Sequence, residues 1–173
     1  AISITAYPAE QYMLVLWDHG GGPKDGFGGD DRAPEGGDYG YITSDQLSNA
    51  IKEAKTLLGS DTVSENDLDK FAMLGFDACL MGNLETSLAM SSYADYLVGS
   101  EDLEPGTGWD HRGYVRDICS MTSDDFGKDK INKSVEKLGK VICDDSIRFY
   151  DPKTENTMSI VKLDLEKLKG LDS

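Results

Sequence analysis

The sequence has few of the residue types that most often carry nucleophilic or metal chemistry. Its 173 residues include three cysteines, Cys79, Cys119 and Cys143, and two histidines, His19 and His111. An odd number of cysteines does not make a disulfide framework, and no C-x-x-C pair suggests zinc or thioredoxin-like chemistry. Few side chains are therefore left that can act as a nucleophile.

Basic residues are also scarce, with 17 Lys and Arg against 32 Asp and Glu and a formal net charge of −15. Because phosphate binding needs clustered Lys and Arg, this balance excludes nucleic acid and anionic membrane surfaces as partners. The longest apolar run, Met13 to Trp17, is far shorter than the ~20 residues of a membrane-spanning helix. Hydrophobic residues still make up 39%, which is enough to bury one core.

Strand-like and helical segments alternate along the chain. Tyr12–Trp17, Phe71–Phe76 and Tyr96–Ser100 are apolar runs typical of strands covered on both faces. Further patterns predict a strand over Asn156–Lys162, a helix that is capped by Thr43 or Ser44 and ends at Gly59, and helices over Gly82–Tyr93, Lys128–Tyr150 and Leu163–Leu168. This alternation predicts an α/β fold with a mostly parallel sheet. Ligands bind beyond the carboxyl ends of such strands, so we expect the site in the loops that follow them.

A histidine follows the first apolar run and a cysteine follows the second. His19 and Cys79 are therefore a candidate base and nucleophile at neighbouring strand ends. Free cysteine has a pKa of about 8.5, so a nearby imidazolium or helix amino terminus is needed to form the thiolate. Gly20 lets a carbonyl approach the backbone, and its N–H together with that of Cys79 can bind an oxyanion. These residues predict acyl transfer, against the plainer interpretation of an inert core cysteine and a solvated histidine.

Three blocks of the sequence resemble the clostripain family of cysteine peptidases. They are LVLWDHGGG (14–22), GFDACLMG (75–82), and YADYLVGSE (93–101) with EPGTGW (104–109). The resemblance implies a caspase-like three-layer α/β/α sandwich, with Cys79 as nucleophile and His19 as the general acid that protonates the leaving amine. It also implies peptide or protein substrates cleaved after Arg or Lys, the P1 residue, with Asp77 in the pocket that binds the P1 side chain.

One departure from the family pattern concerns that pocket. Clostripain-like sequences often read EPG-D-GW, whereas this chain has Thr107 in place of the acidic residue, followed by Trp109. We place Thr107 and Trp109 with the substrate-binding residues. Asp102 and Asp110 are candidates to replace the missing carboxylate, unless they are ordinary solvated loop charges.

The resemblance implies further properties. Self-cleavage between the His and Cys blocks is expected, with Arg32–Ala33 as the first candidate bond and Lys24–Asp25 as the second, unless both basic residues are plain loop residues. No cofactor is required. Calcium supports some clostripain-like enzymes, and Asp30-Asp31 and Asp144-Asp145 supply oxygen atoms, although we assign no ligand.

The resemblance also implies a bacterial protein that is secreted, periplasmic or at the cell surface. Family catalytic domains carry a strand and helix before the histidine strand, so we interpret residues 1–173 as one domain, truncated, processed or a shorter variant.

Some predictions remain open at this point. Cys119 and Cys143 fall in helical stretches and are predicted to be core residues, with a bridge between them left open, and Trp17 is predicted to lie in the core. His111 is predicted to be a solvated loop histidine, with a place in the wall of the cleft as the alternative. A lipase-like interpretation of the glycines after His19 fails because no G-x-S-x-G is present. The competing function is a catalytically inactive caspase-like binding or regulatory module.

Overall fold

The computed structural model of the chain describes residues 2–29, 40–59, 70–121, 131–150 and 157–170. Four strands form one sheet in spatial order β1 (Met13–Trp17), β2 (Phe71–Asp77), β3 (Ala94–Ser100) and β4 (Met158–Lys162). The first three strands are parallel, and β4 runs antiparallel to β3. The mostly parallel sheet predicted from the alternation of strands and helices is confirmed.

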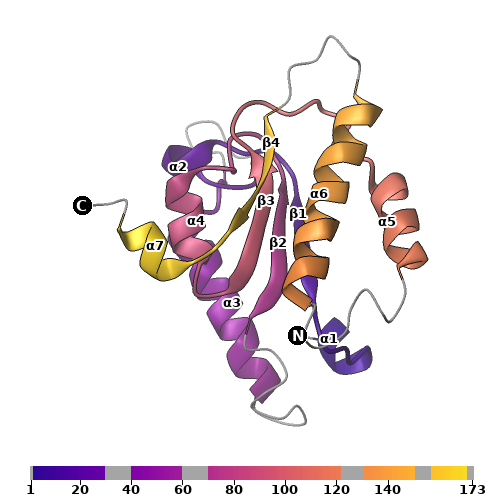
Figure 1. Cartoon of the computed structure of the whole chain (residues 1–173). Coiled ribbons are helices and arrows are strands. Elements are labelled where there is room, and N and C mark those ends of the chain that lie inside the picture. The colour runs from indigo at the N-terminus through magenta and orange to yellow at the C-terminus, as the bar shows by residue number, and fades with distance from the viewer. Residues whose placement is uncertain (1, 30–39, 60–69, 122–130, 151–156, 171–173) are drawn as a thin grey trace.

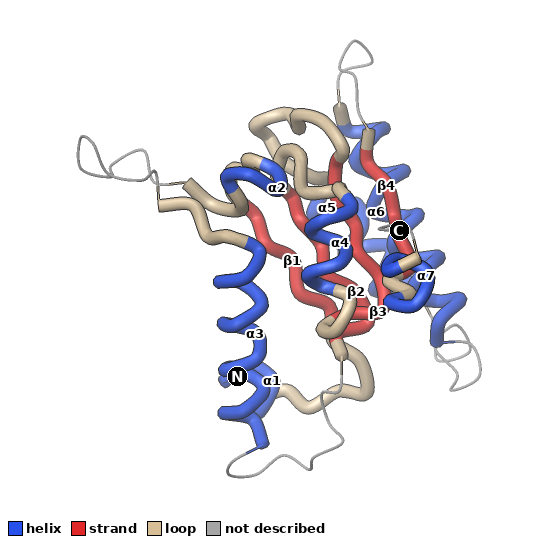
Figure 2. The backbone as a smooth tube through the Cα atoms, turned by 90° about the vertical axis from the view of Figure 1, so that its left-hand side faces the viewer, coloured by secondary structure: helices blue, strands red, loops and turns tan. Residues whose placement is uncertain are grey.

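Helices cover both faces of this sheet (Figures 1 and 2). One layer holds α3 (Ser44–Gly59), α4 (Leu84–Met90) and α7 (Leu165–Lys169), and the other holds α5 (His111–Ser120) and α6 (Ile131–Phe149). Two short helices, α1 (Ile2–Ala6) and α2 (Gly22–Asp25), flank β1 in the chain. The predicted three-layer α/β/α sandwich is confirmed.

Each face of the sheet has its own apolar core, and β2 contributes to both. Leu74 and Phe76 pack with Ile51 of α3 on one face, whereas Met73 packs with Ile142 of α6 on the other. Successive side chains of a strand point to opposite faces, so a strand between two helical layers must be apolar at every position. This requirement explains the unbroken apolar run that β2 shows in the sequence.

The same pattern is misleading for β1. Among the described strands β1 pairs with β2 alone, and its residues Met13 to Leu16 are only half-buried. Trp17 is 66% exposed, so the prediction that it lies in the core is wrong. An apolar run reports contact with apolar neighbours, but it does not report whether the strand is central or at an edge.

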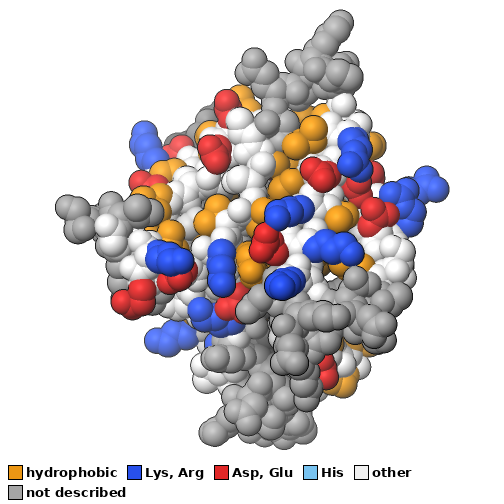
Figure 3. All heavy atoms as spheres, viewed as in Figure 1, with side chains coloured by type: hydrophobic (Ala, Val, Ile, Leu, Met, Phe, Trp, Pro, Cys, Tyr) orange, Lys and Arg blue, Asp and Glu red, His pale blue; other side chains and the backbone are white. Residues whose placement is uncertain are grey.

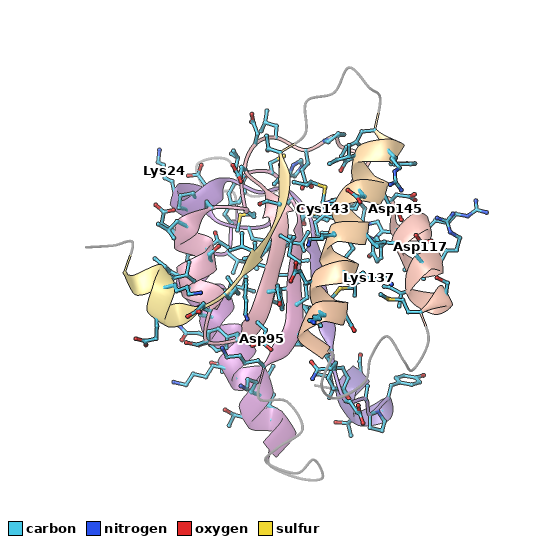
Figure 4. The ribbon with its side chains drawn as sticks, in the orientation of Figure 1. Lys24, Asp95, Asp117, Lys137, Cys143 and Asp145 are labelled. Carbon is cyan, nitrogen blue, oxygen red and sulfur yellow. The ribbon has the colours of Figure 1, made fainter. Side chains whose placement is uncertain are left out.

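The helices follow local signals more closely. Thr43 and Gln46 form a reciprocal capping box at the start of α3, since each side chain accepts a hydrogen bond from the other's backbone N–H. Cys143 is buried on α6, as predicted (Figure 4). Cys119 lies on α5 in a helix, as predicted, but it is exposed and so is not a core residue. All three cysteines are free, so the bridge that was left open is not formed.

No helix within the described ranges has the length and apolar character that a bilayer crossing requires.

Candidate active site

The carboxyl ends of β1 and β2 lie side by side, and they bring the two predicted reactive residues together. Trp17 is in register with Asp77, and the Asp18 N–H extends the ladder to the Asp77 carbonyl at 3.3 Å. His19 and Cys79 follow directly and line one cavity of about 330 Å³. The loop after β3 forms part of the cavity wall, which comprises Trp17, Asp18, His19, Asp77, Ala78, Cys79, Glu104, Pro105, Gly106 and Gly108.

Cys79 is half-buried and sits in a tightly held turn. The backbone N–H of Glu104 donates to Cys79 Sγ at 3.2 Å, and the thiol in turn faces the Glu104 carbonyl oxygen at 3.8 Å. The next residue, Leu80, has φ 63°, a conformation that is rare for a residue with a side chain. Its N–H donates to the Asp102 carbonyl at 3.0 Å, and its carbonyl accepts from Asn83 Nδ2 at 2.7 Å. The turn that presents the sulfur is therefore fixed on both sides.

Gly20 lies directly against the nucleophile turn. A Cβ added at Gly20 would come within 2.0 Å of the Cys79 carbonyl oxygen, so only glycine fits at this position. His19 itself is exposed, its backbone N–H donates to Asp18 Oδ1 at 2.6 Å, and its carbonyl accepts from Gly28 at 2.8 Å. The close approach places the backbone of the His19–Gly20 segment next to Cys79.

Asp77 is almost completely buried at the base of the cavity, with 2% of its surface exposed. Its carboxylate accepts from the Trp109 N–H at 3.0 and 3.2 Å and contacts His111 Nε2 at 2.7 Å. The other ring nitrogen of His111 contacts Tyr114 Oη at 2.8 Å. His111 begins α5 and contacts the carboxylate of Asp77, so it is not a loop histidine, although its side chain is 45% exposed to solvent as predicted. It does not belong to the cavity wall that the described residues form.

The sequence analysis missed Glu104 as a member of the site. Glu104 lines the cavity, and one of its carboxyl oxygens accepts from Trp109 Nε1 at 3.2 Å. Its other oxygen is buried and has no hydrogen-bond partner among the described residues. Burial and the neighbouring Asp77 charge raise the pKa of Glu104 to about 8, against the opposing effect of the Trp109 indole. Glu104 is the first residue of the EPGTGW block (104–109) that resembles the family. The sequence analysis considered only Thr107 and Trp109 of that block as substrate-binding residues.

The remaining predicted substrate-binding residues do not line the cavity. Thr107 is exposed, and Trp109 is buried with its ring against Gly75, where it supports Asp77 and Glu104 from behind. Neither belongs to the cavity wall that the described residues form. Of the two candidate replacement carboxylates, Asp102 is exposed and outside that wall, while Asp110 caps α5 by accepting from the Gly113 N–H at 2.9 Å.

Of the residues named in the processing and calcium predictions, those that the structure describes do not belong to the cavity wall. Lys24 is exposed on α2, while Arg32, Asp30 and Asp31 lie outside the described residues. Asp145, which Figure 4 labels on α6, forms an ion pair with Arg148 at 3.2 Å. Within the described ranges no group of three His, Cys, Asp or Glu side chains is placed to hold a metal ion. Calcium binding stays a prediction.

The chain has solved structural neighbours with the same fold. A three-layer sandwich with a cysteine and a histidine at adjacent strand ends defines the caspase-like class. A secreted C11 cysteine protease from Bacteroides thetaiotaomicron, in complex with an irreversible peptide inhibitor, aligns with a TM-score of 0.63 and 21% identity, over 97% of this chain and 43% of its own. An inactive zymogen C11 protease from Parabacteroides distasonis aligns with a TM-score of 0.51 and 23% identity, over 98% and 38%. A B. fragilis cysteine protease aligns with a TM-score of 0.54 and 18% identity, over 84% and 49%.

The sequence profile of the Clostripain family matches residues 2–173, and the chain belongs to that family. The predicted family resemblance is therefore confirmed. The chain spans less than half the length of each of these three solved structures. No curated protein matches the chain.

Proposed function

We propose that this chain forms the catalytic part of a cysteine endopeptidase that cleaves peptide bonds after Arg or Lys. The observation that carries the proposal is the cavity onto which Cys79, His19 and the buried carboxylate of Asp77 all open. Membership of the Clostripain family supports the peptidase class. The presence of the Cys79, His19 and Asp77 side chains on one cavity wall supports the assignment of acyl transfer.

In the proposed reaction Cys79 Sγ, as the thiolate, attacks the carbonyl carbon of the P1 residue. The resulting oxyanion is stabilised by the backbone N–H groups of Gly20 and Cys79, two residues whose backbones pack closely, since a Cβ at Gly20 would meet the Cys79 carbonyl oxygen. His19 in its protonated form gives its proton to the leaving amine as the C–N bond breaks. Water then attacks the thioester, which releases the carboxylic acid and regenerates the thiolate and the imidazolium.

Asp77 supplies the anion for a basic P1 side chain. A guanidinium or ammonium group that leaves water needs a paired carboxylate, and Asp77 is held in place by Trp109 and His111. In this arrangement the backbone donor and the imidazole fix the carboxylate before substrate arrives. The substrates we propose are therefore peptides or proteins with accessible Arg or Lys.

Labelling with an arginyl acyloxymethyl ketone tests the catalytic proposal, because only a reactive thiolate beside a formed P1 pocket should be alkylated. We expect the native protein and Cys119→Ala, which removes an exposed cysteine outside the cavity, to be labelled once, and Cys79→Ala not at all. A fluorogenic panel with Arg, Lys, Asp and Asn at P1 measures the preference. If Cys79 reacts with iodoacetamide while the native protein takes up no ketone and cleaves no reporter, the chain is instead an inactive binding module.

We also propose self-cleavage at Arg32–Ala33 or Lys24–Asp25, and location outside the cytoplasm. The Parabacteroides distasonis neighbour is described as an inactive zymogen and one Bacteroides thetaiotaomicron neighbour as secreted, which supports both ideas by analogy. Mass spectrometry of the native protein and Cys79→Ala tests the first idea. Fragments ending at Arg32 or Lys24 should appear in the native protein only, and equal amounts in both would exclude self-processing.

A further inference from the structure

Glu104 contacts both the nucleophile Cys79 and the proposed P1 pocket. Its backbone N–H donates to Cys79 Sγ at 3.2 Å, while its side chain reaches the cavity wall and accepts from the indole N–H of Trp109. The backbone N–H of the same tryptophan donates to Asp77. One rigid aromatic residue, 2% exposed, thus positions both carboxyl groups in one cavity.

The free oxygen of Glu104 is the unusual feature. A buried carboxyl oxygen without a partner costs free energy, and a proton on that oxygen lowers the cost. The Asp77 carboxylate is close enough to accept a hydrogen bond from a protonated Glu104, and together with burial it raises the pKa of Glu104 to about 8. Two carboxyl groups that share one proton leave the empty cavity with one negative charge.

We propose that Glu104 is a second specificity-determining carboxyl group of this cavity, which binds the basic P1 side chain together with Asp77 and releases its proton as that side chain enters. The inference deepens the proposed function and rests on it. The exchange balances, since a cationic side chain enters, one proton leaves to solvent, and the cavity then holds two carboxylates around one cation. In this role Glu104 supplies the charge that Thr107 does not.

Other titratable groups surround this pair and must be separated from it. Those that interact with Glu104 or Asp77, or line the same cavity, are Asp18, His19, Asp77, Cys79, His111, Tyr114, Cys143 and Tyr150. Burial raises the pKa of Cys143 to about 11, and burial and nearby negative charges raise the pKa of Tyr150. His19 and Cys79 line the same cavity as Glu104, so the comparison has to be made against a variant of Glu104 alone.

The test measures binding of benzamidine, an unreactive amidinium ion, by calorimetry from about pH 6 to about pH 9 in buffers of different ionisation enthalpy. For the native protein we expect close to one proton released per molecule bound near pH 7, and affinity that rises with pH and levels off above about pH 8. Glu104→Gln should release markedly less than one proton and should bind about 10- to 100-fold more weakly at the upper end of the range. Neutral benzamide, used as a control ligand, should release no proton from the native protein.

Glu101→Gln is the matched control, because Glu101 is an exposed acid three positions away and outside the cavity wall. We expect it to bind benzamidine as the native protein does, and Glu104→Asp to retain part of the proton release. If Glu104→Gln binds as tightly as the native protein with the same proton release, the role of Glu104 is overturned and the peptidase proposal stands. If neither the native protein nor Glu101→Gln binds benzamidine at all, the basic P1 pocket itself is wrong.

Discussion

Asp77 combines two roles that usually belong to different residues. Its carboxylate satisfies the Trp109 N–H and contacts His111, as a structural carboxylate would, yet the residue also lines the cavity. Hydrogen bonds to a charged acceptor are stronger than those between neutral groups, so these contacts hold the carboxylate in one position. A fixed carboxylate is a better partner for a substrate cation than a mobile one, because less side-chain entropy is lost on binding.

Asp77→Ala is expected to abolish cleavage of arginyl reporters, and Asp77→Asn to lower kcat/KM for them by about 100-fold or more, since a buried charge pair is lost. The amide retains an oxygen that can accept from Trp109, so the asparagine variant should keep its fold. Steady-state kinetics measures the loss, and the rate of Cys79 alkylation by iodoacetamide serves as the control and should match the native rate. Unchanged arginyl turnover in either variant would contradict the pocket assignment.

Part of this site could be predicted from the sequence because it is local. His19, Asp77 and Cys79 stand within two residues of a strand end, and parallel strands bring such ends to one edge. Glu104, His111 and Trp17 could not be assigned this way. Their roles depend on how the loop after β3 folds back over Cys79 and on β1 lying at an edge, and neither follows from local periodicity.

The segment from the nucleophile turn to α4 acts as one structural element. Asn83 caps α4 by accepting from the Thr86 N–H at 2.8 Å, and the same side chain donates to the Leu80 carbonyl at 2.7 Å. The left-handed conformation at Leu80 costs on the order of 1 kcal/mol and persists only where surrounding contacts hold it. Asn83 therefore couples the stability of the helix to the position of the sulfur.

Substitution of Asn83 can separate these two effects. We expect Asn83→Ala to lower the free energy of unfolding by about 1–2 kcal/mol, since both the cap and the donor to Leu80 are lost. Asn83→Asp keeps the cap but not the donor, so it should retain more stability while Cys79 still alkylates more slowly than in the native protein. Urea unfolding and iodoacetamide kinetics give the two readouts. Equal alkylation rates in all three proteins would show that the turn does not depend on Asn83.

Local sequence identifies the strands of this fold but does not reveal the position of each strand in the sheet. The apolar runs of β1 and β2 look alike, yet β2 is buried on both faces and β1 is half-buried. The position of a strand in the sheet is decided by residues far away in the chain, such as Ile142 of α6, which packs with Met73. The bounds of α3 and α6 agree more closely with the sequence patterns, because the capping box at Thr43 and the apolar stripe of α6 are local signals, whereas the sequence patterns gave no bounds for α5.

At the scale of the whole molecule, Glu104 also links stability to pH. In the unfolded chain its pKa returns to the ordinary value of 4.5, whereas in the folded protein its pKa is about 8. Between these pH values the folded state binds more protons than the unfolded state, so the contribution of Glu104 to the free energy of unfolding falls as pH rises. Its stabilising effect should be fully present below about pH 4.5 and lost above about pH 8.

Urea unfolding of the native protein and Glu104→Gln over this pH range tests the linkage. Because glutamine resembles the protonated side chain and does not titrate, the native protein should lose stability relative to the variant as pH rises from 5 to about 8. A difference between the two proteins that does not change with pH would contradict the shifted pKa of Glu104.

The overall charge of the molecule has a consequence for substrate capture. The sequence has a net charge of −15, and both signs of charge occur on the side of the molecule that Figure 3 shows. A negative field attracts cationic peptides over a distance set by the Debye length, which is about 10 Å at 0.1 M salt. Association with basic substrates is therefore expected to weaken with ionic strength.

We expect kcat/KM for a peptide with several Arg or Lys residues to fall several-fold when salt rises from about 0.02 M to about 0.2 M. A peptide with one Arg and compensating acidic residues should change little, because its net charge is near zero. Measuring both peptides over the same salt series separates electrostatic steering from a general effect of salt on the protein. Parallel salt dependence for the two peptides would argue against long-range attraction.

The two tryptophans give the molecule a built-in optical reporter. Trp109 is enclosed behind the cavity, whereas Trp17 is open to water and lies on the cavity wall. Fluorescence from an indole in water responds to quenchers such as iodide, and an enclosed indole is shielded from them. A molecule that occupies the cavity covers Trp17. The emission wavelength of the unlabelled protein and its quenching by iodide therefore report whether the cavity is occupied.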